Sequence, residues 1–252
     1  KNKKKIAAII QARMGSKRFP GKVMKKICNK PIIQLQIERL RKSKYIDEII
    51  LSTSTSSKDK ILKNFCEKKM GIKVFAGSEN DVLDRVSKTV KKFNVDIHVE
   101  CFGDSPLVDP KLIDQFLRKF KKIKTDCLAN TLKTTYPPGQ EIFISKGKKL
   151  NELNRMIKKN DILREHVSFN FTRFQDKFSI FNIHSPKKYN FPEIYMEIDR
   201  PVDLKFLKKI YNYFDKKKKI YFSLDEILKF LKKNSELPKI NNKVFRKWKL
   251  LR

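Results

Sequence analysis

Residues 6–22 read IAAIIQARMGSKRFPGK and join an apolar run to a loop that is rich in cations. Residues 6–10 have the length and composition of a buried β-strand. The loop that follows contains two glycines, a proline and four cationic side chains, namely Arg13, Lys17, Arg18 and Lys22. Ligands of open α/β sheets bind at the carboxyl ends of the strands, and small residues let backbone N–H groups approach an anion closely. The stretch therefore predicts a polyphosphate-binding site.

Spacing excludes two common phosphate-binding motifs from this loop. A P-loop has four residues between its glycines and then Lys with Ser or Thr, whereas five residues separate Gly15 from Gly21 and Val23 follows Lys22. A G-x-G-x-x-G dinucleotide motif is absent because the turn supplies a single glycine. The alternative to a nucleotide site is a plain surface loop in a lysine-rich protein.

The charge of the chain is strongly positive. Its 252 residues carry 60 Lys and Arg against 27 Asp and Glu, a formal net charge of +33. Such an excess is typical of nucleic-acid-binding proteins, and that function stays open as an alternative. However, the lysines are spread along the chain on the polar faces of predicted helices, so we expect no specific nucleic-acid partner. The excess charge would instead attract small anionic substrates.

Four widely spaced cysteines form no C-x-x-C pair, which argues against a zinc site or a disulfide framework. His98 lies in an apolar run and is predicted to be a hydrogen-bonded structural residue. No apolar run reaches the length of a membrane span. We therefore expect a cytoplasmic protein without membrane insertion.

The first half alternates between strand and helix patterns. Strands are predicted at 6–10, 46–52, 73–76 and 96–102, and helices at 31–43, 58–70, after 77–85 and at 111–120. Ser78 or Asn80 is expected to cap the third helix, and Asp109 the fourth. The alternation predicts an α/β fold with a doubly wound, mostly parallel sheet and right-handed crossovers.

The second half is less regular and predicts a small α+β extension. Its expected strands are 126–130, 141–145, 178–183 and 193–198. Its expected helices are 147–158, 161–169, one opened by residues 199–203, and 223–233 with Ser223 as its cap. The basic tail, residues 243–252, is expected to be a mobile or docked end.

Five motifs, at residues 10–22, 77–85, 103–110, 164–167 and 198–204, together resemble the cytidylyltransferase family. The resemblance spans the chain in order. It is strongest to the SpsF-like branch of spore-coat polysaccharide proteins, which is related to the acylneuraminate and 3-deoxy-manno-octulosonate cytidylyltransferases. It implies a nucleotide-diphospho-sugar transferase-like fold in one domain, 1–252. Residues 1–125 would form the nucleotide-binding half, and 126–252 the acceptor-binding and dimerisation half of a homodimer.

The reaction that this resemblance implies is a nucleotidyl transfer. An acceptor oxygen attacks the α-phosphorus of CTP, pyrophosphate leaves, and the acceptor is linked to CMP. Catalysis of such a step is mainly positioning and electrostatic stabilisation. The implied catalytic residues are Arg13, Lys22, Asp104 and Asp199, with Asp104 and Asp199 also as ligands of Mg²⁺. For each aspartate, a turn or a helix cap is the competing interpretation.

The resemblance also implies two sets of binding residues. Nucleotide contacts would come from Ala12, Arg13, Gly15, Ser16, Arg18, Lys22, Thr53, Ser78, Asp81, Arg85 and Asp104. Asp81 and Arg85 are four residues apart, so a surface ion pair is the alternative for them. Acceptor contacts would come from Gln140, Glu141, Arg164, Glu165 and His166, where packing between helix and sheet is the alternative.

The expected acceptor is a small anion such as a nonulosonic or related sugar acid, used in surface-glycan biosynthesis. Residues 137–141 read Pro-Pro-Gly-Gln-Glu, where relatives commonly carry a stretch of the Asp-Gly-Leu-Asp type. This departure leaves phosphate and phosphonate acceptors open. A nucleotide-binding relative without transferase activity is a further alternative.

Overall fold

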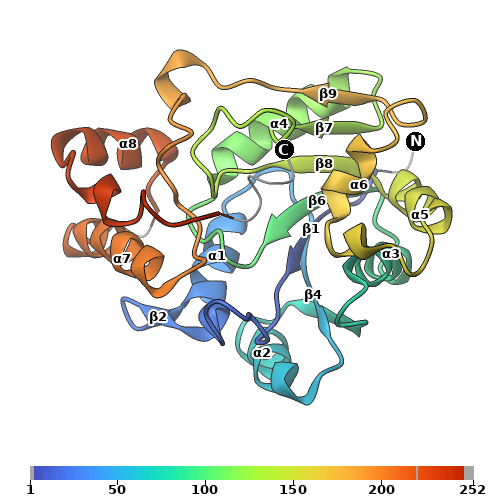
Figure 1. Ribbon diagram of the computed structural model, residues 1–252, viewed down its shortest axis with the longest axis horizontal. Coiled ribbons are helices and arrows are strands. Elements are labelled where there is room, and N and C mark those ends of the chain that lie inside the picture. Colours follow the sequence, from blue (N-terminus) through green and yellow to red (C-terminus); the bar gives the residue numbers. More distant parts are fainter. Residues whose placement is uncertain (1–2, 220, 247–252) are drawn as a thin grey trace.

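A seven-stranded sheet forms the centre of the computed structural model, which describes residues 3–219 and 221–246 (Figure 1). The strand order is β5-β4-β1-β6-β8-β7-β9. Strands β5, β4, β1 and β6 are parallel, β8 is antiparallel to β6 and β7, and β9 is parallel to β7. The strands are β1 Ile6–Gln11, β4 Glu48–Ser54, β5 Lys73–Gly77, β6 Ile97–Phe102, β7 Cys127–Ala129, β8 Phe143–Lys146 and β9 Ile180–Asn182. The predicted doubly wound, mostly parallel sheet is confirmed.

Helices cover both faces of this sheet because the central strands are apolar on both sides. Residues 6, 8 and 10 of β1 belong to one buried cluster, and Ala7 and Ile9 belong to another. The first cluster includes α1 (Ile32–Leu40), α2 (Lys60–Asn64), α4 (Pro110–Lys122), α7 (Pro201–Lys216) and α8 (Leu224–Lys233). The second includes α3 (Val82–Lys92), α5 (Gly147–Met156) and α6 (Val167–Thr172). The site residues thus stand on a rigid two-sided core.

One strand prediction is wrong. Residues 193–198 do not join a sheet, although Ile194, Tyr195, Met196 and Ile198 are buried. The N–H of Met196 donates to Pro138 O at 2.6 Å, and the N–H of Ile198 donates to Asp104 O at 2.9 Å. A run of apolar residues indicates burial, and an irregular segment packed on neighbouring loops can be buried as well as a strand can. This segment delivers Asp199 beside the turn that holds Asp104.

Smaller differences concern ends and caps. Asp81 caps α3 by accepting the N–H of Asp84, where Ser78 or Asn80 was expected. The caps Asp109 and Ser223 are confirmed. The predicted helix 58–70 is a 3₁₀ turn, α2 and a π-helical turn, and 161–169 is a 3₁₀ turn followed by α6. A hairpin of β2 (Lys26–Ile27) and β3 (Lys30–Pro31) was not predicted.

The structure also bears on His98, on the basic tail and on the expectation that no segment spans a membrane. His98 is fully buried with Nδ1 at 3.2 Å from Ser145 Oγ, and burial lowers its pKa to about 3, which confirms a structural role. In the basic tail Arg246 is buried and bonded to Asp203, Lys243 and Phe245 are exposed, and residues 247–252 lie outside the described residues. Among the described helices, none is long and apolar enough to cross a membrane.

Candidate active site

Lys22 joins the two aspartates that the sequence singles out. Its Nζ donates to Asp104 Oδ2 at 2.6 Å, to the carbonyl oxygen of Ile198 at 2.7 Å and to Asp199 Oδ1 at 3.3 Å. The lysine comes from the loop after β1, Asp104 from the turn after β6, and Asp199 from the residues before α7. β1 and β6 are neighbours at the centre of the sheet (Figure 1). The site therefore lies at the carboxyl ends of the central parallel strands.

Gly103 lets the ends of β1 and β6 approach each other closely. A Cβ atom at this position would lie 2.6 Å from Ala12 Cβ and 3.2 Å from Gln11 O, closer than packed atoms come. On the other side of the site, Pro201 is the first residue of α7, where its fixed φ angle suits the start of a helix. The N–H of Asp199, two residues earlier, donates to Asp203 Oδ2 at 2.9 Å. These backbone constraints fix where the carboxylates of Asp104 and Asp199 emerge.

Charges in this cluster compensate one another. Arg18 Nη2 also donates to Asp199 Oδ1, at 2.8 Å. Burial alone would raise the pKa of Asp199, but the hydrogen bond from Arg18 and the charge of Lys22 outweigh burial and lower it. Burial alone would lower the pKa of Lys22, but Asp104 and Asp199 outweigh it and raise the pKa. Asp199 is thus an anion and Lys22 a cation at neutral pH.

The donor set fits Mg²⁺. No group of three or more His, Cys, Asp or Glu side chains that could hold a metal occurs within residues 3–219 and 221–246. Mg²⁺ does not need such a group, since it commonly binds one or two carboxylates and completes its octahedron with water and substrate phosphates. Asp104 and Asp199 supply two carboxylates that a single ammonium group already bridges. A hard cation with phosphate ligands suits this pair better than zinc does.

Arg13 lies at the other end of the cationic loop and is held by exposed acids. Its Nη1 donates to Glu79 O at 3.0 Å, and its Nη2 donates to Glu165 Oε1 at 3.1 Å. The Glu165 side chain is 55% exposed. Because exposed ion pairs contribute little free energy, a phosphate could replace Glu165 on the guanidinium at low cost. The Cβ of a larger residue at Gly15 would contact Glu79 Oε1 at 3.1 Å, so the loop passes close to this acid.

The remaining predicted nucleotide contacts fall into two groups. Ala12 and Thr53 lie beside the end of β1, and Thr53 is fully buried with no described partner for its hydroxyl oxygen. Ser16 lies farther along the loop, where its Oγ accepts from the N–H of Phe19 at 3.3 Å. Arg85 is also buried, and its Nη1 donates to Ser78 O at 2.7 Å. Burial, aided by the charge of Arg13, lowers the pKa of Arg85 to about 10. The surface pair considered for Asp81 and Arg85 is therefore not what the structure shows.

Three of the predicted acceptor contacts are used inside the fold. Gln140 is fully buried, with Oε1 accepting from the N–H of Asp109 at 2.9 Å. Arg164 is buried and pairs with Asp81 at 2.8 Å, and the Glu141 carboxylate accepts from Gly139 N–H at 2.6 Å. Their positions match the packing interpretation. Glu165 and His166, by contrast, are exposed and lie on the Arg13 side of the site.

His166 has the properties of a neutral imidazole. The residue is exposed, yet enough protein surrounds the ring that desolvation lowers its pKa below the ordinary value of 6.5, and the neighbouring charge of Glu165 opposes this only partly. A histidine with a lowered pKa is unprotonated at neutral pH and can accept a proton. The sequence identified this residue, but only the structure shows the direction of its pKa.

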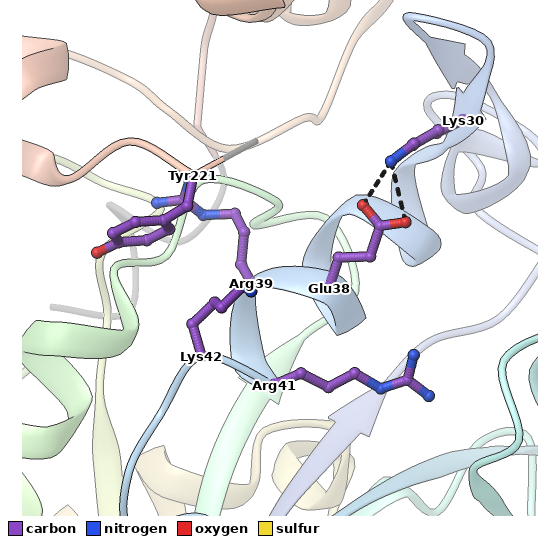
Figure 2. Close-up of a pocket in the computed structure, with 6 residues that line it drawn as sticks. All are labelled: Lys30, Glu38, Arg39, Arg41, Lys42 and Tyr221. Carbon is purple, nitrogen blue, oxygen red and sulfur yellow. Dashed lines mark hydrogen bonds and ion pairs between the residues drawn. The ribbon is translucent and has the colours of Figure 1, made fainter. Parts of the chain in front are cut away.

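A separate pocket of about 240 Å³ lies at the end of α1 (Figure 2). Two of its cations, Lys30 and Arg39, are engaged within the fold: Lys30 pairs with Glu38 at 2.8 Å, and Arg39 donates to the carbonyl oxygens of Leu107, Val108 and Phe222. Its lining residues are Lys30, Glu38, Arg39, Arg41, Lys42 and Tyr221. None of them is a predicted site residue. The pocket is therefore no rival to the Asp104 and Asp199 site.

Two residues of the site were missed by sequence reasoning. Asp203 anchors the backbone of Asp199, and Arg246 anchors Asp203. Asp203 could have been found, because an acid three residues into a helix that begins with proline is a common partner of the preceding N–H groups. Arg246 gives no signal, since it is one cation in a basic tail more than forty residues away.

Comparisons with known proteins agree with this geometry. The cytidylyltransferase family model matches residues 7–234. The chain is 33% identical over 245 residues to protein MJ1063 of Methanocaldococcus jannaschii, covering 96% of this chain and 97% of that protein. It is 28% identical over 235 residues to the spore coat polysaccharide biosynthesis protein SpsF of Bacillus subtilis, covering 92% and 95%.

A solved cytidylyltransferase from Leptospira borgpetersenii serovar Hardjo-bovis superposes with a TM-score of 0.87 at 29% identity, over 97% of this chain and 100% of that one. Its fold is therefore shared along the whole length, including the second half that the sequence described least well. The resemblance seen in the five motifs is confirmed. The chain belongs to the cytidylyltransferase family and is a CTP-dependent nucleotidyltransferase.

Proposed function

We propose that the protein transfers CMP from CTP to a small anionic acceptor, such as a nonulosonic or related sugar acid, and releases pyrophosphate. The observation that carries the proposal is the convergence of Asp104 and Asp199 on Lys22. Its place in surface-glycan biosynthesis rests on the likeness to SpsF, a spore coat polysaccharide biosynthesis protein. We also propose that the protein is cytoplasmic and forms a homodimer; the exposed Phe181 on the edge strand β9 is in line with the homodimer.

In this proposal the residues of the site bind and stabilise the negative charges of the CTP phosphates. Arg13 exchanges Glu165 for a phosphate group of CTP and orients the triphosphate. Asp104 and Asp199 would hold Mg²⁺, which would neutralise charge on the phosphoryl oxygens. Lys22, which the two aspartates keep protonated, supplies a fixed cation beside them. Fixed charges of this kind stabilise the charge that develops at the α-phosphate without reorganisation.

The experiment that tests this proposal must identify the acceptor molecule. The protein is incubated with CTP, Mg²⁺ and a panel of sugar acids, sugar phosphates and phosphonates, and CMP conjugates are detected by mass spectrometry together with pyrophosphate. We expect one acceptor class to give a CMP conjugate and pyrophosphate in equal amounts. CTP binding without turnover on any acceptor would favour a nucleotide-binding relative without transferase activity.

Arg13→Met is expected to weaken CTP binding by about 10- to 100-fold, because a hydrogen bond to a charged group contributes about 1.5–3 kcal/mol. Fold stability should hardly change, since the ion pairs of Arg13 with Glu79 and Glu165 are exposed. Isothermal titration calorimetry with CTP measures the effect. Lys17→Met is the matched control, as Lys17 is an exposed cation of the same loop. Equal CTP affinity of the Arg13 and Lys17 variants would contradict the role of Arg13.

His166→Gln is expected to lower kcat by about 10²- to 10⁴-fold if the imidazole accepts the acceptor's proton. Because the pKa of His166 is lowered, the wild type should keep its neutral base at pH 7 and lose kcat/KM as the pH falls below that pKa, which is under 6.5. The variant should lose this acidic limb of the pH profile. A variant that keeps the limb would show that another group titrates there.

A further inference from the structure

A buried charge pair lies directly behind Asp199. Arg246 and Asp203 are both fully buried, with Nη2 at 2.5 Å from Oδ1 and Nη1 at 3.1 Å from Oδ2. Asp203 belongs to the first turn of α7, whereas Arg246 comes from residues 241–246 after α8. In Figure 1 this last described stretch, in dark red, runs back from the α8 side toward the middle of the molecule. Two segments far apart in the sequence therefore meet at the base of the site.

Asp203 connects Arg246 to the backbone of Asp199 through hydrogen bonds. Its Oδ2 accepts from the N–H of Asp199 at 2.9 Å and from the N–H of Arg200 at 2.7 Å. Its Oδ1 accepts from Arg246 and from Asn241 Nδ2, the latter at 2.8 Å. Both carboxylate oxygens are thus fully used. A continuous chain of bonds leads from Arg246 through Asp203 to the residue whose carboxylate faces Lys22 and Arg18.

Helix capping alone does not require this arrangement. An exposed acid in the first turn would accept the same two N–H groups without the cost of burying a second charge. Arg246 is further constrained, since its guanidinium lies 4.6 Å from the centre of the Tyr195 ring and 3.8 Å from Glu197 Oε1. Buried ion pairs contribute weakly to net stability, and their best-supported value is to enforce one geometry.

We propose that Arg246 is a positioning residue for CMP transfer. It fixes the Asp203 carboxylate, which holds the backbone of Asp199 and so aims the Asp199 carboxylate at the metal site. The inference rests on the proposed function, in which Asp199 is a ligand of Mg²⁺. Residues that orient metal ligands from behind typically change metal affinity or activity by about 10- to 100-fold when they are replaced.

The test compares three variants of the full chain: Arg246→Met, Arg246→Lys, and Lys243→Met as an exposed control in the same segment. Mn²⁺ affinity of the CTP complex is measured by electron paramagnetic resonance, which does not depend on turnover. Kinetics then give kcat and the KM for CTP. For Arg246→Met we expect about 10- to 100-fold weaker Mn²⁺ binding, a similar loss of kcat and a nearly unchanged KM. Arg246→Lys should recover part of both losses, and Lys243→Met should match the wild type.

Asp199→Asn separates this inference from the proposed function. If Asp199→Asn binds Mn²⁺ and turns over like the wild type, the metal role of Asp199 fails and the inference fails with it. If Asp199→Asn loses both properties while a folded Arg246→Met keeps them, only the inference fails. Should Arg246→Met not fold, Arg246→Lys decides by the same readouts, with wild-type Mn²⁺ affinity overturning the proposal. In the Asp199→Asn background, Arg246→Met is expected to add little further loss.

Discussion

Asp199→Asn and Asp104→Asn are each expected to lower kcat for CMP transfer by at least about 10²- to 10³-fold, the loss that follows removal of one preorganised electrostatic contact. An amide keeps the shape of the carboxylate but removes the negative charge that Mg²⁺ and Lys22 both require. Initial rates of pyrophosphate release at saturating CTP measure the effect. Excess Mg²⁺ should recover part of the rate, because the remaining aspartate still provides one ligand.

The control for these variants is Asp176→Asn, which removes an exposed carboxylate in the second half of the chain. It should leave kcat and the Mg²⁺ dependence at wild-type values. Circular dichroism on all three variants separates chemistry from folding. Full activity of Asp104→Asn and Asp199→Asn in properly folded protein would remove both residues from the metal site.

Lys22→Met is expected to destabilise the metal-free protein by about 3–5 kcal/mol, the range measured when one partner of a buried ion pair is removed. Lys22 is 8% exposed, and its loss leaves Asp104 and Asp199 facing each other without their shared cation. Mg²⁺ should then stabilise the variant more than the wild type, because its binding relieves that repulsion. Differential scanning calorimetry with and without Mg²⁺ measures both shifts in Tm.

The pH dependence of this loss follows from two pKa shifts. The pKa of Asp199 is lowered in the folded protein, so its stabilising contribution is present above about 3.8 and is lost as the pH falls through the lower folded value. The pKa of Lys22 is raised, so its contribution is present below 10.5 and is lost only above that. The cost of Lys22→Met should be constant between pH 6 and 9 and shrink below about pH 4. Lys17→Met should show neither the loss of stability nor its pH dependence. If Mg²⁺ raises the Tm of Lys22→Met by no more than it raises that of the wild type, Lys22 is not the cation that Asp104 and Asp199 share.

The sheet could be predicted because its strands are short apolar runs separated by helical periodicity. β1, β4, β5 and β6 were found this way. Their parallel direction follows from the helical crossovers that connect them. The error at residues 193–198 has the same cause, since an apolar run indicates burial and not strand pairing. The hairpin of β2 and β3 was missed because its residues 28 and 29 carry no glycine, although both have positive φ.

The charged residues of the candidate site could be predicted, but the buried residues that hold them in place could not. The pairing of Asp104 with Asp199 came from the resemblance to the cytidylyltransferase family, because Asp104 follows strand β6 whereas Asp199 follows a segment that belongs to no sheet. Whether a polar residue faces the ligand or the core depends on packing that a sequence does not show. Gln140 and Arg164 are buried among backbone carbonyls and amides, and Arg246 is buried at the end of a tail that reads as a surface charge run.

The most direct test of the account is a crystal structure of the protein grown with CTP and Mn²⁺, in which anomalous scattering locates the metal. The account predicts a peak that both Asp104 and Asp199 ligate, shared with phosphate oxygens of CTP whose triphosphate lies against Arg13. A bound CTP with its Mn²⁺ peak away from both aspartates, or CTP bound outside the loop of residues 11–22, would contradict it.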